Sequence, residues 1–464
     1  MRNVNAGEVE IDAPALEKIT VVSDADDNVA TVAPTSDLSQ GVQVVVEKEI
    51  KTPQTLGDGS TPTIFNFLSM PFAFNTANIK YWDGDSWETP EPENHVRILL
   101  YNSQKRANND YKNTWEKITT STHKTVAANQ GFVIVGNNDL GTTVKLQFTS
   151  EEAAYDGSVT SVTANRYRKA EGETNSQDGD WNFNGVPYLT AGEFAGEYTL
   201  YTYDNNTLGY VSHTPALGLP TLKPYQAVMY QAEIAGEEMT KEIAINSASI
   251  SNANASENVY ARAYISIDDS TPAKIILSDE TSENFVVNED AWYMPSLINT
   301  TPAAYFNVGG ADASVSVQPA ANELPMTVYT GAGTSHRISL TATDGNYNVY
   351  LKDAATDETV CLNDEDYTFT ATAKTTIADR FTVSMIEPTG IIDAARAEGT
   401  IKPVVLSNAI KLYGTEEGDQ VSLYTANGMI ITNAVTEEGV TTIPTSVTGV
   451  IIIKVAGETV KVVK

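Results

Sequence analysis

The chain has 464 residues and a formal net charge of −31 at pH 7, from 60 Asp and Glu against 29 Lys and Arg. A single hydrophobic core rarely grows past roughly 250–300 residues, so this length predicts two or more domains. The charge argues against nucleic acid as a partner, because a phosphate-binding surface needs clustered Lys and Arg. The single cysteine, Cys361, excludes a disulfide within the chain.

The first 40 residues predict a polar lead. MRNVNAGEVEIDAPALEK (1–18) holds no apolar run of signal-peptide length, and no stretch of the sequence is long enough to cross a bilayer as a helix. We therefore expect either a cytoplasmic protein or an exported one whose signal peptide is not present in this sequence. Residues 23–40 are acidic and rich in Ser and Thr, which suits a loose lead or an edge strand.

From residue 41 onward the sequence predicts β-strands almost throughout. Short alternating runs of Thr, Val, Tyr and Ile recur, and turn dipeptides such as Asp-Gly and Asn-Gly separate them. The clearest runs are 42–50, 143–149, 198–204, 261–267 and 420–426. Amphipathic helical periodicity over a dozen residues is hard to find. The pattern predicts an all-β fold made of several β-sandwich units.

An internal repeat organises the first half of the chain. FNFLSMPF (65–72) and WNFNGVPY (181–188) align without gaps, and two further matching segments follow each of them in the same order. These are an aromatic strand, at 80–87 and 201–210, and a Gln beside an apolar strand, at 129–136 and 224–231. We expect the aromatic residues of the first segment to enter a core and its Pro to end strand pairing. The Gln is expected to cap the loop before the third strand.

These signals divide the chain into six segments. A polar connector opens the second repeat, small polar residues join it to a third unit, and DRFTVSM closes that unit with an alternating strand. The predicted segments are an N-terminal lead (1–40), a first β repeat (41–165), a second β repeat (166–250), a third β-sandwich (251–386), a linker (387–402) and a C-terminal β-domain (403–464).

The C-terminal segment carries a pattern of its own. A strand with Val421, Leu423 and Tyr424 leads into an Asn-Gly turn, and GVIIIKV (449–455) follows before a final Lys-x-x-Lys. This pattern resembles the type A C-terminal sorting domain of proteins exported by the type IX secretion system of Bacteroidetes. The resemblance covers about the last seventh of the chain. It departs from the family at Ile451, where Tyr is usual.

The resemblance implies a small Ig-like β-sandwich that the type IX secretion machinery recognises as its partner. It implies export to the outer-membrane cell surface or the extracellular space. The sorting signal would then include Gly449, Val450, Lys454, Lys461 and Lys464. Upstream, 41–386 is similar to β-rich repeats of large surface proteins of the same bacteria, which have no fixed activity. For the C-terminal segment, the alternative to a sorting domain is an ordinary terminal β-domain with no role in export.

Catalytic motifs are missing from the sequence. The four His lie far apart without zinc-ligand spacing, and neither a G-x-S-x-G elbow, a Walker loop nor a strand-linked G-x-G-x-x-G occurs. We therefore expect a structural or adhesive cell-surface protein with no catalytic activity. A carbohydrate-binding surface module is the first alternative. A glycoside hydrolase-like enzyme is the second, because the carboxylate pair of such enzymes is a spatial feature that sequence spacing does not reveal.

Two groups of residues are candidates for ligand binding. In YWDGDSW (81–87), Trp82, Trp87 and Asp85 carry the ring faces and carboxylate that suit a host or dietary glycan, whereas Tyr81 is expected in the core. Acidic loops could bind Ca²⁺ through oxygen ligands. The best pair for calcium is Asp364 with Asp366, followed by Asp268 with Asp269. Plain solvated turns are the alternative interpretation of both pairs. Besides glycans, we expect surface proteins as a second class of partner.

Overall fold

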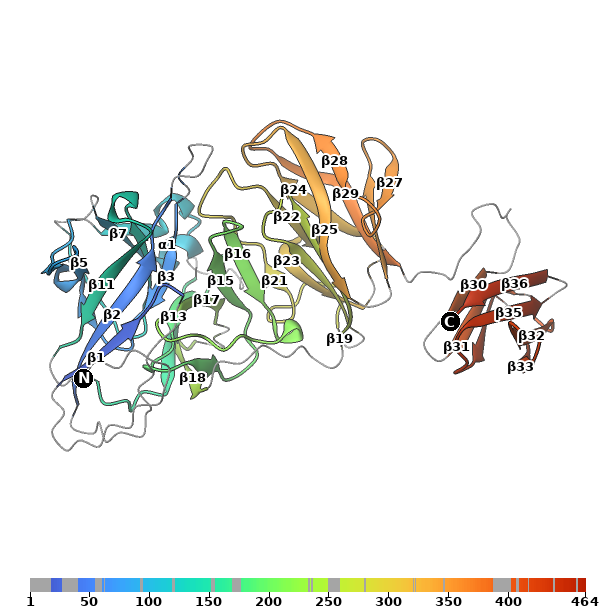
Figure 1. The fold of residues 1–464 in the computed structure, drawn as a ribbon, viewed down its shortest axis with the longest axis horizontal. Helices are drawn as coiled ribbons and strands as arrows, with labels where there is room; N and C mark the ends of the chain where they lie inside the picture. The colour runs from blue at the N-terminus through green and yellow to red at the C-terminus, as the bar shows by residue number, and fades with distance from the viewer. Residues whose placement is uncertain are drawn as a thin grey trace.

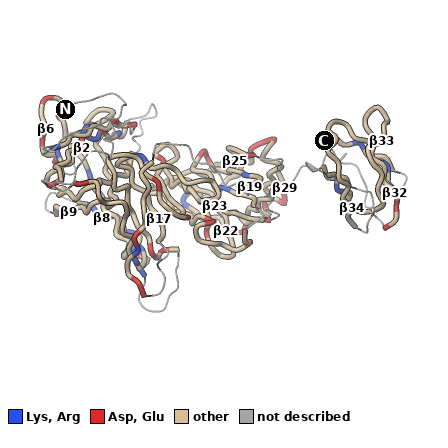
Figure 2. The backbone as a smooth tube through the Cα atoms, turned by 90° about the horizontal axis from the view of Figure 1, so that it is seen from below, with Lys and Arg blue, Asp and Glu red and all other residues tan. Residues whose placement is uncertain are grey.

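The computed structural model confirms an all-β, multi-domain fold (Figure 1). The structure describes residues 18–26, 41–54, 61, 63–91, 95–118, 122–151, 155–168, 177–232, 234, 237–248, 259–278, 281–319, 321, 323–344, 347–386, 402–405, 409–415, 417–436, 439–455 and 458–464. Most of the predicted lead and of the 387–402 linker therefore lies outside the described residues. Within them, no helix is long and apolar enough to cross a membrane. Asp and Glu residues occur along the chain in every unit (Figure 2).

The first unit packs two sheets face to face. One sheet has the order β1 (Lys18–Ser23), β2 (Gln43–Lys51), β11 (Thr143–Thr149), β5 (Lys80–Trp82), β6 (Trp87–Glu88). The other has the order β3 (Asn66–Ser69), β10 (Gly131–Gly136), β7 (Val96–Tyr101), β8 (Trp115–Ile118). A small pair, β4 (Phe74–Asn75) and β9 (Thr125–Val126), and the helix α1 (Ser103–Ala107) complete it. Alternate residues of β2 and β11 enter the core, as their alternating sequences predict.

The second unit repeats this plan. One sheet has the order β12 (Ser161–Asn165), β18 (Thr240–Ser247), β14 (Gly192–Phe194). The other has the order β13 (Trp181–Gly185), β17 (Ala227–Gln231), β15 (Leu200–Asp204), β16 (Gly209–His213). The predicted boundary at 165/166 lies too late, because β12 pairs with β18 from Ser161 onward and so belongs to the second unit.

The predicted repeat is confirmed at two of its three segments. The order β3-β10-β7-β8 in the first unit matches β13-β17-β15-β16 in the second, so the first and third segments are equivalent strands. The second segment was matched wrongly. The β5–β6 hairpin joins the opposite sheet beside β11, and the structural counterpart of β15–β16 is β7–β8. Both hairpins alternate aromatic and turn residues, and that pattern does not identify the sheet that a hairpin joins.

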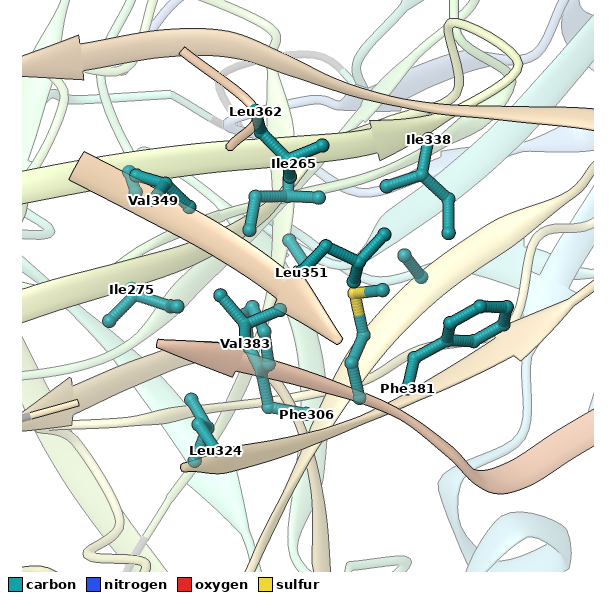
Figure 3. Close-up of a cluster of buried hydrophobic side chains, with 14 of the residues drawn as sticks. Ile265, Ile275, Phe306, Leu324, Ile338, Val349, Leu351, Leu362, Phe381 and Val383 are labelled. Atoms are coloured by element: carbon teal, nitrogen blue, oxygen red, sulfur yellow. The ribbon is translucent and has the colours of Figure 1, made fainter. Parts of the chain in front are cut away.

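The third unit, 259–386, is one continuous sheet that curves around its core. In the described residues it has eleven strands in the order β27-β26-β29-β24-β22-β23-β20-β19-β25-β28, with β21 beside β23. Their bounds are β19 (Val259–Ile267), β20 (Ala273–Ser278), β21 (Ala291–Trp292), β22 (Ala303–Val308), β23 (Ala311–Gln318), β24 (Leu324–Tyr329), β25 (Ser335–Asp344), β26 (Asn348–Asp353), β27 (Glu358–Cys361), β28 (Tyr367–Thr370) and β29 (Thr376–Ile386). Side chains from strands far apart in this order, such as Ile265 of β19 and Val349 of β26, meet in one apolar cluster (Figure 3).

The C-terminal unit, 402–463, is a small β-sandwich with its own core. Its sheets have the orders β30 (Lys402–Val405), β31 (Ala409–Thr415), β34 (Gly439–Pro444) and β33 (Ile430–Val435), β32 (Gln420–Thr425), β35 (Val450–Val455), β36 (Glu458–Val463). Fully buried Leu412, Leu423 and Ile453 fill the space between them. Lys402, predicted to end the linker, is the first residue of β30.

Candidate binding cleft between the two repeats

The two repeats meet through a pair of reciprocal backbone contacts. In the first unit, the Ser69 backbone N–H donates to the carbonyl oxygen of Tyr225 in the second unit, at 2.9 Å. In the second unit, the Gly185 backbone N–H donates to the carbonyl oxygen of Asn129 in the first unit, at 3.0 Å. Ser69 ends β3 and Gly185 ends β13, which are equivalent strands. The junction therefore has local twofold pseudosymmetry.

The loops that supply these carbonyl groups have the same conformation. Asn129 and Tyr225 both have positive φ angles, 63° and 67°. Each is followed by a Gln whose Oε1 accepts a backbone N–H three residues earlier, from Ala127 to Gln130 and from Lys223 to Gln226, both at 3.1 Å. The predicted capping role of these two Gln side chains is confirmed.

Glycine permits the close approach of the two units. A Cβ atom at Gly131 would lie 2.5 Å from the Phe183 ring, and one at Gly185 would lie 2.5 Å from the Cβ of Ser69. Ordinary carbon contacts are about 3.5–4.0 Å. Ala227, the counterpart of Gly131, stands in the second unit's copy of the loop. A side chain is therefore tolerated on one side of the junction and not on the other.

The two sides of the junction differ most at the equivalent residues Tyr225 and Asn129, because only Tyr225 fills the space beside its loop. Tyr225 is 1% exposed, and its ring belongs to the apolar core of the first unit together with Tyr155 and Leu189. Asn129 is 8% exposed and is a smaller, polar residue. A cleft of about 560 Å³ lies beside Asn129, between the first and second units. We call it the inter-repeat cleft.

The inter-repeat cleft is lined by both units. The loop 127–131 and the start of α1 border it from the first unit. The outward residues of β12, namely Ser161, Thr163 and Asn165, border it from the second, because Val162 and Ala164 between them point into the core. Aromatic rings of Tyr101, Tyr167 and Phe183 complete the lining.

One acidic side chain lies in this lining. Glu242 on β18 accepts the hydroxyl groups of Ser161 (2.6 Å) and Thr163 (2.5 Å), and these hydrogen bonds lower the pKa of its carboxyl group. Glu242 is therefore ionised at neutral pH. Among the described lining residues it is the only charged one. The cleft thus offers hydroxyl, amide and carboxylate groups beside aromatic rings.

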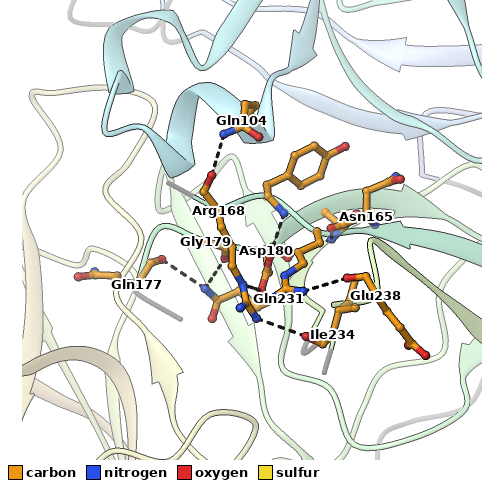
Figure 4. A network of polar contacts seen from close by, with 12 residues as sticks. Gln104, Asn165, Arg168, Gln177, Gly179, Asp180, Gln231, Ile234 and Glu238 are labelled. Carbon is orange, nitrogen blue, oxygen red and sulfur yellow. Dashed lines mark hydrogen bonds and ion pairs between the residues drawn. The ribbon is translucent and has the colours of Figure 1, made fainter. Parts of the chain in front are cut away.

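A network of hydrogen bonds fixes the wall that carries Asn165 and Tyr167 (Figure 4). Asn182 bonds both the N–H and the carbonyl oxygen of Asn165, at 2.8 and 2.9 Å. Asp180 accepts the N–H of Tyr167 at 2.8 Å. Gln104, on α1 of the first unit, donates to the carbonyl oxygen of Arg168 at 3.1 Å. The wall is held before any ligand arrives, which lowers the entropic cost of binding.

A buried arginine strengthens the same junction. Arg106 on α1 lies 4.3 Å from the centroid of the Trp181 ring in the second unit, and Asp178 lies 3.5 Å from its Nε. Tyr111 donates to Asp178 at 2.7 Å, which links both units again. Cation–π contacts of desolvated groups are worth about 2 kcal/mol. The two repeats therefore form one body around the cleft.

The predicted glycan residues lie elsewhere, on the β5–β6 hairpin. Trp82 and Trp87 pair across it, with ring centroids 5.5 Å apart and ring planes at 65°. Trp82 is 37% exposed and Asp85 is exposed in the turn. The two rings do not form one flat platform. Tyr81 packs against the core, as expected.

Two of the four predicted calcium residues, Asp269 and Asp366, pair with an arginine. Arg337 Nη1 lies 2.8 Å from Asp366 and its Nη2 lies 2.7 Å from Asp269, while Asp268 contacts His336 Nδ1 at 2.7 Å. Asp364 is exposed in the neighbouring turn. The Arg337 guanidinium thus supplies the positive charge beside Asp269 and Asp366. In the described parts of the chain, no group of three or more His, Cys, Asp or Glu is arranged to hold a metal ion.

The predicted sorting residues lie on one hairpin. Gly449 precedes β35 with a φ of 99°, and its backbone pairs in both directions with Lys464. Lys454 extends over the ring of Tyr424, 5.4 Å from its centroid, and Lys461 is exposed on β36. The hairpin brings together residues that are up to fifteen positions apart in the sequence.

No family model matches this chain, and no curated protein matches it significantly. The inter-repeat cleft was missed in the sequence, although a signal for it existed. ANQG (128–131) replaces the PYQA (224–227) of the other copy, and Asn and Gly in WNFNG replace the Leu and Ser of FNFLS.

Proposed function

We propose that this chain is a non-catalytic structural or adhesive protein of a bacterial cell surface, exported through its C-terminal β-domain. The observation that carries the adhesive role is a shared core. One apolar cluster contains Phe67 of the first unit, Phe183 of the second and Val315 of the third. Three units joined in this way make a stiff, extended body, which suits holding a binding surface away from a cell.

The junction between the second and third units adds polar support. Ser212 and Ser314 hydroxyl groups lie 2.7 Å apart, and Lys274 donates to the carbonyl oxygen of Ser212 at 2.9 Å. The backbone N–H of Trp292 donates to the Tyr201 hydroxyl at 2.8 Å. Buried contacts of this kind resist bending at the boundary between units.

Export is supported by the C-terminal pattern. The sorting residues share the β35–β36 hairpin, where a secretion machine could contact them together. Its partner would be the type IX machinery, and the final location the outer surface or the medium. We also propose, on the same resemblance, that this C-terminal unit is Ig-like.

The hydrolase alternative is not favoured by the inter-repeat cleft. Glycosidases need two carboxyl groups on opposite sides of the bond that is broken. Glu242 is the only carboxylate among the described residues that line the cleft. The carbohydrate-binding alternative does not need a second carboxylate.

Export can be tested by fusing residues 403–464 to a secreted reporter in a host that has a type IX system. We expect the fusion to reach the cell surface or medium, and a fusion lacking 458–464 to stay inside the cell. A Lys461→Ala fusion is the matched variant, because this exposed side chain can be removed without opening the core. Retention of the intact fusion, or export of the truncated one, would leave an ordinary terminal β-domain.

The adhesive role needs a separate measurement. Cells that display the whole chain are compared with cells that display only 403–464, with equal surface amounts checked by antibody. We expect the whole chain to increase attachment to glycan-coated or protein-coated surfaces several-fold. Equal attachment by both strains would contradict an adhesive role.

A further inference from the structure

We infer that the inter-repeat cleft binds an uncharged, hydroxyl-rich ligand of the oligosaccharide class. This inference does not depend on export or on the adhesive role, because a purified chain would bind in the same way. It also differs from the predicted glycan site, since it places the ligand between the repeats and not on the Trp82–Trp87 hairpin.

The first argument is the size of the cleft and its chemistry. Its volume, about 560 Å³, falls in the range of small-molecule sites, roughly 300–1,000 Å³. Its lining differs from that of most such sites, because amides and hydroxyl groups are as prominent as apolar groups. In the described residues the Asn165 amide and the Tyr167 hydroxyl make no hydrogen bond to protein, so both can bond a ligand. The half-buried rings of Tyr101 and Tyr167 also line the cleft and offer apolar surface to the faces of a sugar.

The second argument is charge. No Lys or Arg lines the cleft in the part of the chain that the structure describes, and Glu242 is ionised. The whole chain carries −31. A phosphate, sulfate or uronate would therefore be repelled and would find no cation to pair with. A neutral sugar can donate its hydroxyl groups to the Glu242 carboxylate.

The third argument is the asymmetry of the junction. Protein interiors are close-packed, and the equivalent place beside Tyr225 is filled by its ring. The same backbone therefore accommodates a plug, yet the Asn129 side is open. Asn129 is also buried with its Oδ1 unpartnered in the described structure, an arrangement that costs about 1–3 kcal/mol. Packing alone does not explain an open, polar cleft at this place.

The test begins with an array of neutral oligosaccharides from mannan, xylan and β-glucan, beside acidic ones from polygalacturonate and sialylated glycans. The probe is the whole purified chain. We expect binding to neutral members only. Calorimetry with the best neutral oligosaccharide then gives the Kd for the unmodified chain and its variants. A blank array, or binding confined to acidic members, would overturn the inference.

Asn129→Tyr is the decisive variant, because it copies the plug that Tyr225 supplies at an equivalent φ. We expect it to weaken binding at least 100-fold. Asn165→Ala and Tyr167→Phe leave the cleft open and should each weaken binding about 5–20-fold. Trp82→Ala, on the hairpin, should leave the Kd within 2-fold. Thermal unfolding of each variant checks that its fold is retained.

Each pattern of results has one meaning. Loss of binding in the three cleft variants with Trp82→Ala unaffected supports the inference. Loss in Trp82→Ala with the cleft variants unaffected assigns the ligand to the hairpin and overturns it. If Asn129→Tyr does not fold, Asn165→Ala and Tyr167→Phe decide, and unchanged binding in both overturns it.

Discussion

The two sides of the junction between the repeats share a backbone and differ in what fills them. Asn129 and Tyr225 have nearly the same φ, each precedes a Gln that caps its own loop, and each carbonyl oxygen accepts an N–H from the opposite unit. On one side the tyrosine ring completes a core. On the other side a cleft of about 560 Å³ remains.

This difference distinguishes two groups of residues. One group holds the two units together, and the other determines whether the space beside each loop is filled. The Gln caps and the backbone hydrogen bonds at the strand ends recur in both copies, so they account for how the units dock. The residue before each Gln differs, and with it the space beside the loop. The residue before the Gln, together with the neighbouring replacements named above, thus converts a packing position into an opening.

The largest effect is expected from removing the plug. Tyr225→Asn should lower the free energy of unfolding by about 3–5 kcal/mol, because a buried aromatic ring is lost and a cavity is left. Tyr225→Phe should cost nothing or stabilise, since the Tyr225 hydroxyl is buried without a partner in the described structure. Calorimetric unfolding of both variants measures this. A Tyr225→Asn variant as stable as the parent would show that its ring is not a plug.

The junction of the second and third units offers a further comparison, because it buries the amine of Lys274 and not an aromatic plug. Burial lowers the pKa of Lys274 from 10.5 to about 8. The unfolded chain therefore binds more protons between pH 8 and 10.5, and stability should rise with pH across this window by up to about 3 kcal/mol. Below pH 8 the penalty is fully present.

Lys274→Met removes this titration. The melting temperature of the variant relative to the parent should be highest near pH 7 and should fall as the pH approaches 10. The loss of the donor to the Ser212 carbonyl is the same at every pH, so the slope isolates the amine. A difference that does not change with pH would mean that Lys274 is solvated.

A smaller effect is expected at the glycine of the open side. Gly131→Ala should destabilise the chain by about 1–3 kcal/mol, because the added methyl group overlaps the Phe183 ring. Ala227→Gly, at the equivalent position, should cost only about 0.5–1 kcal/mol, through backbone entropy. Denaturant unfolding compares the two. Combining Gly131→Ala with Phe183→Leu should cost less than the sum of the separate changes if the ring is the obstacle.

The smallest effect concerns Glu242 in the cleft wall. Its pKa is lowered by the Ser161 and Thr163 hydroxyl groups, so its contribution to stability is present above the pKa of the unfolded chain and is lost as the pH falls through the folded value. The melting temperatures of the parent and Glu242→Gln should therefore differ most near neutral pH and converge in acid. A constant difference from pH 6 to pH 3 would contradict this. The exposure of Glu242 keeps the change small.

Local alternation made most strands predictable. TVKLQFT was expected at 143–149 and forms β11 over the same residues, and the runs at 42–50 and 261–267 coincide with β2 and β19 within two residues. Strand formation depends on neighbours in the sequence and on one buried face, and both are visible in a pattern of period two. The Gln caps were predictable for the same reason, because they act within four residues.

Long-range placement was not predictable. The β5–β6 hairpin was matched to the wrong segment of the repeat, β12 was assigned to the wrong unit, and the contact of buried His336 with Asp268 had no signal in the sequence. Each outcome depends on a contact between residues more than 60 positions apart. The inter-repeat cleft belongs to this class, because its walls come from segments on both sides of a domain boundary.

The shared aromatic core of the first three units has a mechanical consequence. Independent domains joined by linkers unfold one at a time under tension, and each unfolding event lengthens the chain by one domain. Here Phe67, Phe183 and Val315 lie in one cluster, so opening any of the three units exposes the flank of the next. We therefore expect the three units to resist a pull along the chain together and to unfold in one event, not one after another.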